Sequence, residues 1–114
     1  MASGIQVRPA SGTWSVRAGG AVLVESDRAL ALEEAGAEPV IFFPREDVAM
    51  AFLDESETVG TADGIGDPRY FSIVTKSTTI HDAARSYAEP SAEAEELRGY
   101  LAFQDSDQVT VEEI

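Results

Sequence analysis

Cysteine is absent from the 114-residue sequence, and histidine occurs only once, as His81. Without cysteine the chain can form neither a disulfide framework nor a thiolate metal site. A single histidine cannot complete the ligand set of a structural zinc ion. If His81 and its neighbour Asp82 lie on a strand, their side chains point to opposite faces. We therefore expect no metal and no cofactor, and a His81 that is exposed or structurally hydrogen-bonded rather than catalytic.

Positive charge is scarce. Eight lysines and arginines stand against 21 aspartates and glutamates, which gives a formal net charge of −13. Nucleic-acid binding draws mainly on lysine and arginine, and attraction to anionic membranes requires the same residues. The composition therefore predicts a protein that binds neither nucleic acid nor a membrane surface.

Long apolar runs are missing too. No segment approaches the roughly 18 apolar residues of a membrane-spanning helix, and the first residues, "MASGIQVRPASG", lack the apolar core of a signal peptide. We expect a cytoplasmic protein that is either a monomer or a homodimer. The nucleophile-elbow, dinucleotide-binding and zinc-ligand motifs are also absent, so whether the protein is an enzyme stays open.

The residues that are present alternate in short pieces typical of strands. In "TWSVR", residues 13–17, Trp14 and Val16 share one face. Gly19-Gly20 separates this piece from "AVLVES", which predicts a hairpin that turns at the glycines. Further strands are expected at "RALALEE" (28–34), "VIFF" (40–43) and "RYFSIVT" (69–75), and a closing hairpin at 99–104 and 109–114.

The period changes at Pro44. In "PREDVAMAFL" (44–53) the apolar residues Val48, Ala51 and Phe52 follow helical spacing, and a proline suits the first turn of a helix. This predicts the main helix of the protein, with Glu46 and Asp47 near its positive end. Arg45 is not explained in this way, since a cation in the first turn is mildly unfavourable.

Less regular segments complete the chain. The polar, glycine-rich stretch 54–68 predicts a loop, and "AEAEELR" (92–98) a short acidic helix that ends at Gly99. Residues 77–90 fit either a helix or a strand. Short strands without long intervening helices favour a mainly β, antiparallel single domain, which we assign to residues 13–114, preceded by a flexible N-terminal segment at 1–12.

The piece "WSVRAGGAVLVESDRALALEEAG", joined to "PVIFFPREDVAMAFL", resembles the DUF427 domain family, a group of small proteins of unassigned function. Later pieces match in order: "GDPRYFS" (66–72), "ARSYAEPSAEA" (84–94) and "GYLAF" (99–103). The resemblance extends from about Trp14 to Val111. It implies a β-tent, Mss4-like fold, which is consistent with the strand pattern.

The resemblance also identifies residues that recur in the family and departures from its pattern. Where the family usually has a Cys-Pro-Tyr-Lys-Gly stretch, this chain reads "ADGIG" (62–66), so Ala62 replaces the cysteine and Ile65 the lysine. Arg85 stands where a tryptophan is common. If the family's site uses the thiol or the amine, this chain has lost that chemistry. The recurring residues are Ser26, Arg28, Glu33, Pro44, Asp47, Gly66, Tyr70, Tyr87 and Pro90.

Two functions follow as hypotheses. The first is a pocket for a small anionic ligand, because the planar guanidinium of arginine suits carboxylates and phosphates. Its residues would be Ser26, Arg28, Glu33, Arg45 and Tyr70. A surface ion pair is the alternative explanation for Arg28 and Glu33.

The second hypothesis is a non-catalytic interaction or scaffold module that uses exposed aromatic side chains. Core packing is the alternative explanation for these residues. Convergence of polar groups in a concave pocket would favour the first function, and an exposed flat aromatic patch the second. The aromatic candidates are Trp14, Phe42, Phe43, Tyr70 and Tyr87.

The charge balance predicts how salt affects stability. At a net charge of −13 the carboxylates repel one another in the folded state, and screening weakens that repulsion. Raising sodium chloride to about 0.15 M should therefore increase the melting temperature. A melting temperature that falls over this range would contradict the prediction.

The lack of zinc-binding residues leads to a second prediction. Because the chain lacks the residues of a structural zinc site, treatment with a chelator should leave the midpoint of urea unfolding unchanged. A clear decrease in the midpoint would show that a metal supports the fold.

Overall fold

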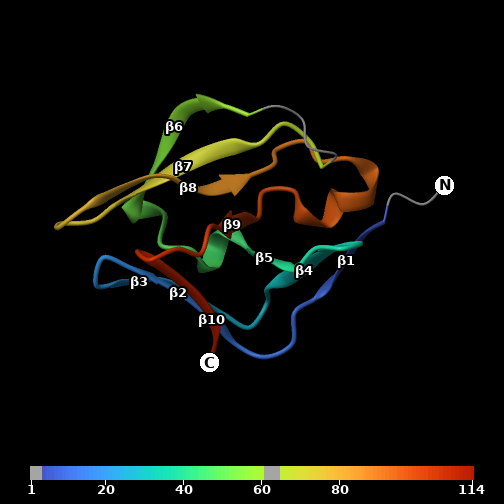
Figure 1. Ribbon diagram of the computed structural model, residues 1–114, viewed down its shortest axis with the longest axis horizontal. Helices are drawn as coiled ribbons and strands as arrows, with labels where there is room; N and C mark the ends of the chain where they lie inside the picture. Colours follow the sequence, from blue (N-terminus) through green and yellow to red (C-terminus); the bar gives the residue numbers. More distant parts are fainter. Residues whose placement is uncertain (1–3, 61–64) are drawn as a thin grey trace.

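The computed structural model describes residues 4–60 and 65–114, which form two antiparallel sheets (Figure 1). The larger sheet has seven strands in the order β1-β4-β5-β9-β8-β7-β6, and the smaller has three in the order β10-β2-β3. The strands are β1 (Ile5–Pro9), β2 (Trp14–Ala18), β3 (Ala21–Ser26), β4 (Leu30–Glu34), β5 (Val40–Phe43), β6 (Leu53–Val59), β7 (Arg69–Val74), β8 (Thr79–Ser86), β9 (Leu101–Phe103) and β10 (Val109–Glu113).

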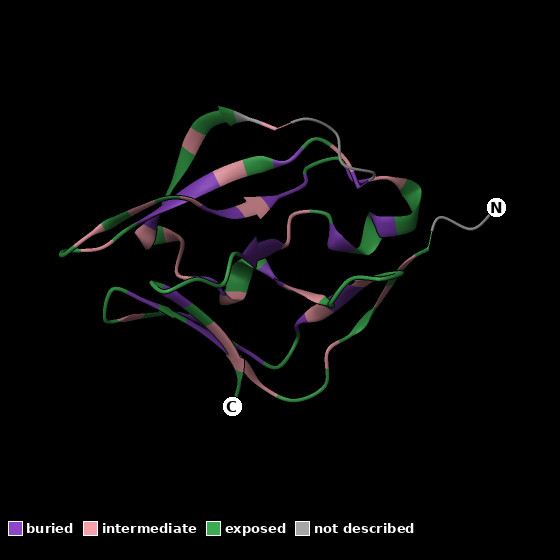
Figure 2. Ribbon diagram, viewed as in Figure 1, coloured by how far each residue is buried: buried purple, intermediate pink, exposed green. Residues whose placement is uncertain are grey.

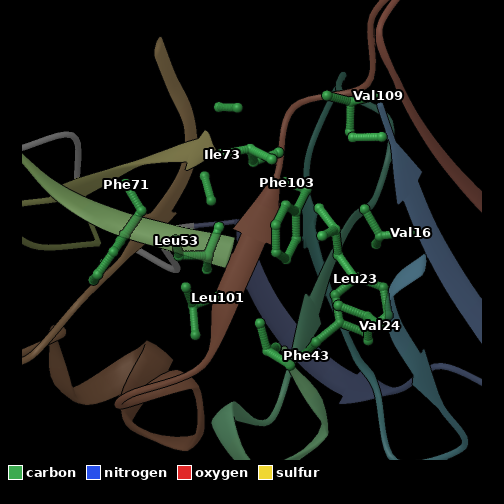
Figure 3. Packing of buried hydrophobic residues seen from close by; sticks show 14 of the residues in the cluster. Val16, Leu23, Val24, Phe43, Leu53, Phe71, Ile73, Leu101, Phe103 and Val109 are labelled. Atoms are coloured by element: carbon green, nitrogen blue, oxygen red, sulfur yellow. The ribbon is translucent and has the colours of Figure 1, made fainter. Parts of the chain in front are cut away.

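The main core lies between the two sheets. Val16, Leu23 and Val24 of the three-stranded sheet pack toward Phe43 and Leu101 of the seven-stranded sheet (Figure 3). Burial is concentrated along these facing strands, whereas the outer edges and turns are exposed (Figure 2). Apolar burial of this kind is the dominant stabilising term in folding.

A second core covers the opposite face of the seven-stranded sheet. Leu32, Phe42 and Tyr87 are buried there together with Leu97 of η3 (Ala92–Leu97). Phe42 and Phe43, adjacent on β5, therefore enter different cores. Burial on both faces explains why "VIFF" is a continuous apolar run rather than an alternating one.

The predicted strands and the first hairpin are confirmed. β2 and β3 pair through Ala18 and Ala21, and Gly19 and Gly20 between them have φ of 56° and 82°. Positive φ at both central residues is what a tight hairpin turn with the right twist requires. Residues 77–90, for which the sequence allowed either a helix or a strand, contain strand β8. The predicted acidic helix is a 3-10 helix at Ala92–Leu97, followed by Gly99 at φ 77°.

The predicted helix at 44–53 is wrong. The segment instead contains two short 3-10 turns, η1 (Arg45–Asp47) and η2 (Met50–Phe52), separated by Val48 in an extended conformation. Val48 forms a β-bridge with Val24, and the Ala49 amide donates to the Leu23 carbonyl at 2.8 Å. Pairing with β3 thus overrides the local helical pattern.

Three other segments differ from expectation. Part of the predicted 54–68 loop is the edge strand β6, which pairs with β7. Its residues are mostly polar, so the sequence did not predict a strand there. Residues 61–64 of the same predicted loop lie outside the described residues. The predicted closing hairpin does not form, because β9 pairs with β5 and β8 while β10 pairs with β2. Residues 5–9, expected to be flexible, form β1 against β4.

Among the described residues, no helix is long and apolar enough to cross a membrane.

Leu97 is the residue by which η3 anchors to the second core, and its side chain is fully buried. Replacing it with alanine should lower the free energy of unfolding by about 2–5 kcal/mol, because a cavity adds to the lost burial. Urea denaturation monitored by circular dichroism measures the change. Glu96→Ala, one residue away and exposed, is the control and should change stability by less than about 0.5 kcal/mol. Equal effects of the two substitutions would contradict the packing role of η3.

Candidate functional site

Ser26 and Arg28, two of the predicted ligand-binding residues, are joined by Asp47 in one hydrogen-bonded network. The Ser26 hydroxyl donates to Asp47 Oδ2 at 2.6 Å and accepts from the Arg28 amide at 3.1 Å. Arg28 Nε and Nη2 donate to Asp47 Oδ2 and Oδ1 at 3.3 and 2.9 Å. This bidentate pair is the strong form of an arginine–carboxylate contact.

The network joins the two sheets. Ser26 ends β3 in the three-stranded sheet, and Arg28 precedes β4 in the seven-stranded sheet. Asp47 belongs to η1, directly after β5. The hydrogen bonds from Arg28 and then from Ser26 lower the pKa of Asp47, and the bonds to Asp47 raise the pKa of Arg28. Both carboxylate oxygens of Asp47 accept hydrogen bonds from within the cluster, so the geometry favours a structural role.

Glu33 and Tyr70 lie elsewhere. Glu33 on β4 accepts a hydrogen bond from Arg8 Nη2 of β1 at 2.5 Å, rather than from Arg28. The Tyr70 ring on β7 lies against Gly60, where a side-chain Cβ in place of the glycine hydrogen would come within 2.9 Å of the ring. The structure therefore does not bring Arg28, Glu33 and Tyr70 together in one pocket.

Arg45 occupies a third environment. Its guanidinium lies 5.7 Å from the centre of the Phe71 ring, a cation–π distance. Tyr70 and Phe71 are consecutive on β7, so their side chains point to opposite faces of the sheet. Arg45 and Tyr70 consequently cannot form the two sides of a shared site.

A hollow of about 520 Å³, which we call the main hollow, lies where β5 and β9 separate. These strands pair only at Phe42–Ala102 and Phe43–Leu101. Continuing that register would bring Ile41 opposite Phe103 and Val40 opposite Gln104. These four residues instead line the hollow, and the three-stranded sheet adds Trp14 and Val111.

A neighbouring hollow of about 330 Å³ extends this space along the sheet. Trp14, Pro39 and Ile41 line both hollows, so we describe the two together as the inter-sheet groove. The extension also contains Glu33 and its partner Arg8. Glu33 is thus the one predicted site residue that the groove includes.

Arg85 is the positively charged group of the main hollow. Its Nε donates to the Tyr87 hydroxyl at 3.1 Å, and its guanidinium lies 5.8 Å from the centre of the Phe42 ring. No carboxylate of a described residue lies within ion-pairing distance of Arg85. Exposed acids, Glu38 and Asp105, line the same hollow.

The sequence signals for this groove are weak. The sequence predicts Trp14 only as a possible interaction residue, and Arg85 stands out only as a departure from the family pattern. A lone arginine among the small residues of "DAARS" on β8 is the available signal. The separation of β5 from β9 has no counterpart in the sequence. In the described part of the chain, no group of three or more histidine, cysteine, aspartate or glutamate side chains is arranged to hold a metal ion.

Comparison with known proteins identifies one family. The family model of a domain of unknown function (DUF427) matches residues 6–113. The chain belongs to the DUF427 family. No curated protein matches it.

The structure shows which contacts several of the residues that recur in the family make in this chain. Three of the family's recurring residues, Ser26, Arg28 and Asp47, form the network between the sheets. Gly66 lies so close to the 89–90 backbone that a Cβ would stand 3.0 Å from the Glu89 carbonyl oxygen. Ile65, at the family's lysine position, is buried in the second core, and Ala62 lies outside the described residues.

Asp47→Asn should lower the free energy of unfolding at pH 7 by about 1–3 kcal/mol, because it weakens a charge-assisted hydrogen-bond network. The pKa of Asp47 is lower in the folded protein than in the unfolded chain. Its stabilisation is therefore present above the unfolded-state pKa of about 4 and is lost as the pH falls through the lower folded-state value. The difference between wild type and variant should shrink in acid.

Urea denaturation at a series of pH values measures this effect. Glu46→Gln is the matched control, because Glu46 neighbours Asp47 but is mostly exposed and 3.8 Å from Arg28. It should have little effect on stability at any pH. A constant difference between Asp47→Asn and wild type across the pH range would contradict the proposed ionic contribution.

Proposed function

We propose that the protein binds a small amphipathic organic anion, such as a monocarboxylate, in the inter-sheet groove. The observation that carries this proposal is Arg85, a guanidinium without a carboxylate partner in the described part of the chain, placed in the main hollow together with Trp14. Arginine binds carboxylates through its planar fork, and indole rings provide rigid apolar contact area.

The size and lining of the groove support a small organic ligand. A volume of about 520 Å³ lies within the range of pockets that bury small molecules. Ile41, Phe103 and Val111 offer apolar walls, and Arg85 offers one directional polar contact. Such a combination suits a ligand with an apolar body and a single anionic end.

The acidic residues restrict the ligand's charge. Glu38 and Asp105 line the same hollow as Arg85, in a chain whose net charge is −13. A second negative charge on the ligand would be repelled by these carboxylates. This favours a monoanion over a dianion in the groove.

The lining favours binding without covalent chemistry. The residues of the main hollow supply carboxylates, an amide and a guanidinium, but not a nucleophile paired with a base. The scaffold hypothesis has less support, because Phe42, Phe43 and Tyr87 are fully buried and cannot form an exposed aromatic patch.

The β-tent, Mss4-like architecture is part of the same proposal. It is supported by two antiparallel sheets that share a core and by the position of the groove where they part.

Binding can be followed without a label, because Trp14 is the only tryptophan of the chain and lines the groove. We expect phenylacetate to change the Trp14 fluorescence in a saturable manner, and the neutral analogue phenylacetamide to bind at least about tenfold more weakly. Arg85→Gln should remove this preference for the anion, while Arg17→Gln, at an exposed ion pair on β2, should retain it.

Three outcomes would contradict the proposal. One is the absence of a saturable change with phenylacetate and with its longer-chain or aliphatic counterparts, such as octanoate. Another is equal affinity for acid and amide in the wild type. The third is an unchanged preference for the acid in Arg85→Gln. Circular dichroism spectra of both variants control for folding.

A further inference from the structure

A separate hollow of about 280 Å³ is lined by two arginines, Arg45 and Arg69. We propose that it binds a tetrahedral oxyanion, either inorganic phosphate or the phosphoryl end of a larger ligand. The site goes beyond the anion groove proposed above and does not depend on it. No described residue lines both this hollow and the main hollow of the groove.

Arg45 lacks the partner that its sequence neighbours would normally supply. Glu46 and Asp47 are adjacent to it in η1, but both carboxylates are directed to Arg28, at 3.8 and 2.9 Å. No other carboxylate of a described residue lies within ion-pairing distance of Arg45. Among the described residues, the Arg45 guanidinium thus has no carboxylate partner.

The position of Arg45 is nevertheless defined. Pro44 before it is buried, and the guanidinium lies 5.7 Å from the centre of the Phe71 ring, which also lines the hollow. A cation held over an aromatic face keeps its N–H donors free at its edge. These donors are available to an anion in the hollow.

Arg69 supplies the second cation. It lies on β7 opposite Ser86 of β8, and both residues line the hollow. Glu55 of β6, which also lines the hollow, accepts from Arg69 Nη1 at 3.1 Å, with both side chains largely exposed. An exposed ion pair of this kind is weak, so the guanidinium can share its remaining donors with a bound anion.

The dimensions of the hollow favour a compact anion. Its volume of about 280 Å³ falls at the lower limit of small-molecule pockets. Two guanidiniums provide more donors than a single carboxylate can accept, whereas a phosphoryl group carries a charge of about −1.5 to −2 and three strong acceptor oxygens. The hollow thus differs from the main hollow of the inter-sheet groove, which has apolar walls and one arginine.

The test is the melting temperature in sodium phosphate compared with sodium chloride at equal ionic strength and pH, which removes the general effect of screening. We expect phosphate to raise the melting temperature of the wild type. Arg45→Gln should lose this rise, and Arg85→Gln should retain it. The Gly99 amide, which lines the same hollow, should shift in ¹⁵N-resolved spectra during phosphate titration of the wild type.

Equal melting temperatures in the two salts, together with an unmoved Gly99 amide, would overturn the proposal. So would a phosphate effect that persists in Arg45→Gln. If Arg45→Gln fails to fold, Arg69→Gln takes its place, since Arg69 is exposed. Persistence of the phosphate effect in Arg69→Gln would equally refute the site.

Glycerol 3-phosphate separates the two ligand sources. Tighter binding than that of inorganic phosphate identifies a phosphoryl group on a larger molecule, and equal binding identifies the free ion. The failure of phenylacetate to bind the groove would leave these results unchanged.

Discussion

The bidentate contact between Arg28 and Asp47, which the Ser26 hydroxyl completes, links the two sheets beside the core that they share. The chain passes between the sheets three times, from β1 to β2, from β3 to β4 and from β9 to β10. The second of these passages carries the network. It is reinforced by the bridge between Val24 and Val48, which attaches the segment after β5 to the edge of β3.

The other two passages border the inter-sheet groove. Pro9, Ala10 and Ser11, after β1, line its smaller part, and Gln104 and Asp105, after β9, line its larger part. The sheets are therefore fixed to each other at one passage and part at the others. This geometry explains how a small domain with two apolar cores can also hold an open space beside its only tryptophan.

The distribution of charge follows from the same arrangement. Arg8, Arg17 and Arg98 form exposed ion pairs with nearby acids, and such pairs contribute little to stability. Arg45 and Arg85 differ, because in the described part of the chain each lies over an aromatic ring and lacks a carboxylate partner. Both of these arginines line hollows, and this connects the fold to its proposed functions.

Local signals in the sequence determined most strands and the first hairpin, because alternating side chains and the glycine pair at 19–20 act over a few residues. The family resemblance identified Ser26, Arg28 and Asp47, but not that they form one network. Which strands pair with one another was decided only in the tertiary structure. Val48 is extended rather than helical because it forms a β-bridge with Val24 of β3. The strands β9 and β10 belong to different sheets although they are neighbours in the chain. The groove depends on where the pairing of β5 and β9 stops, a long-range event for which no local pattern exists.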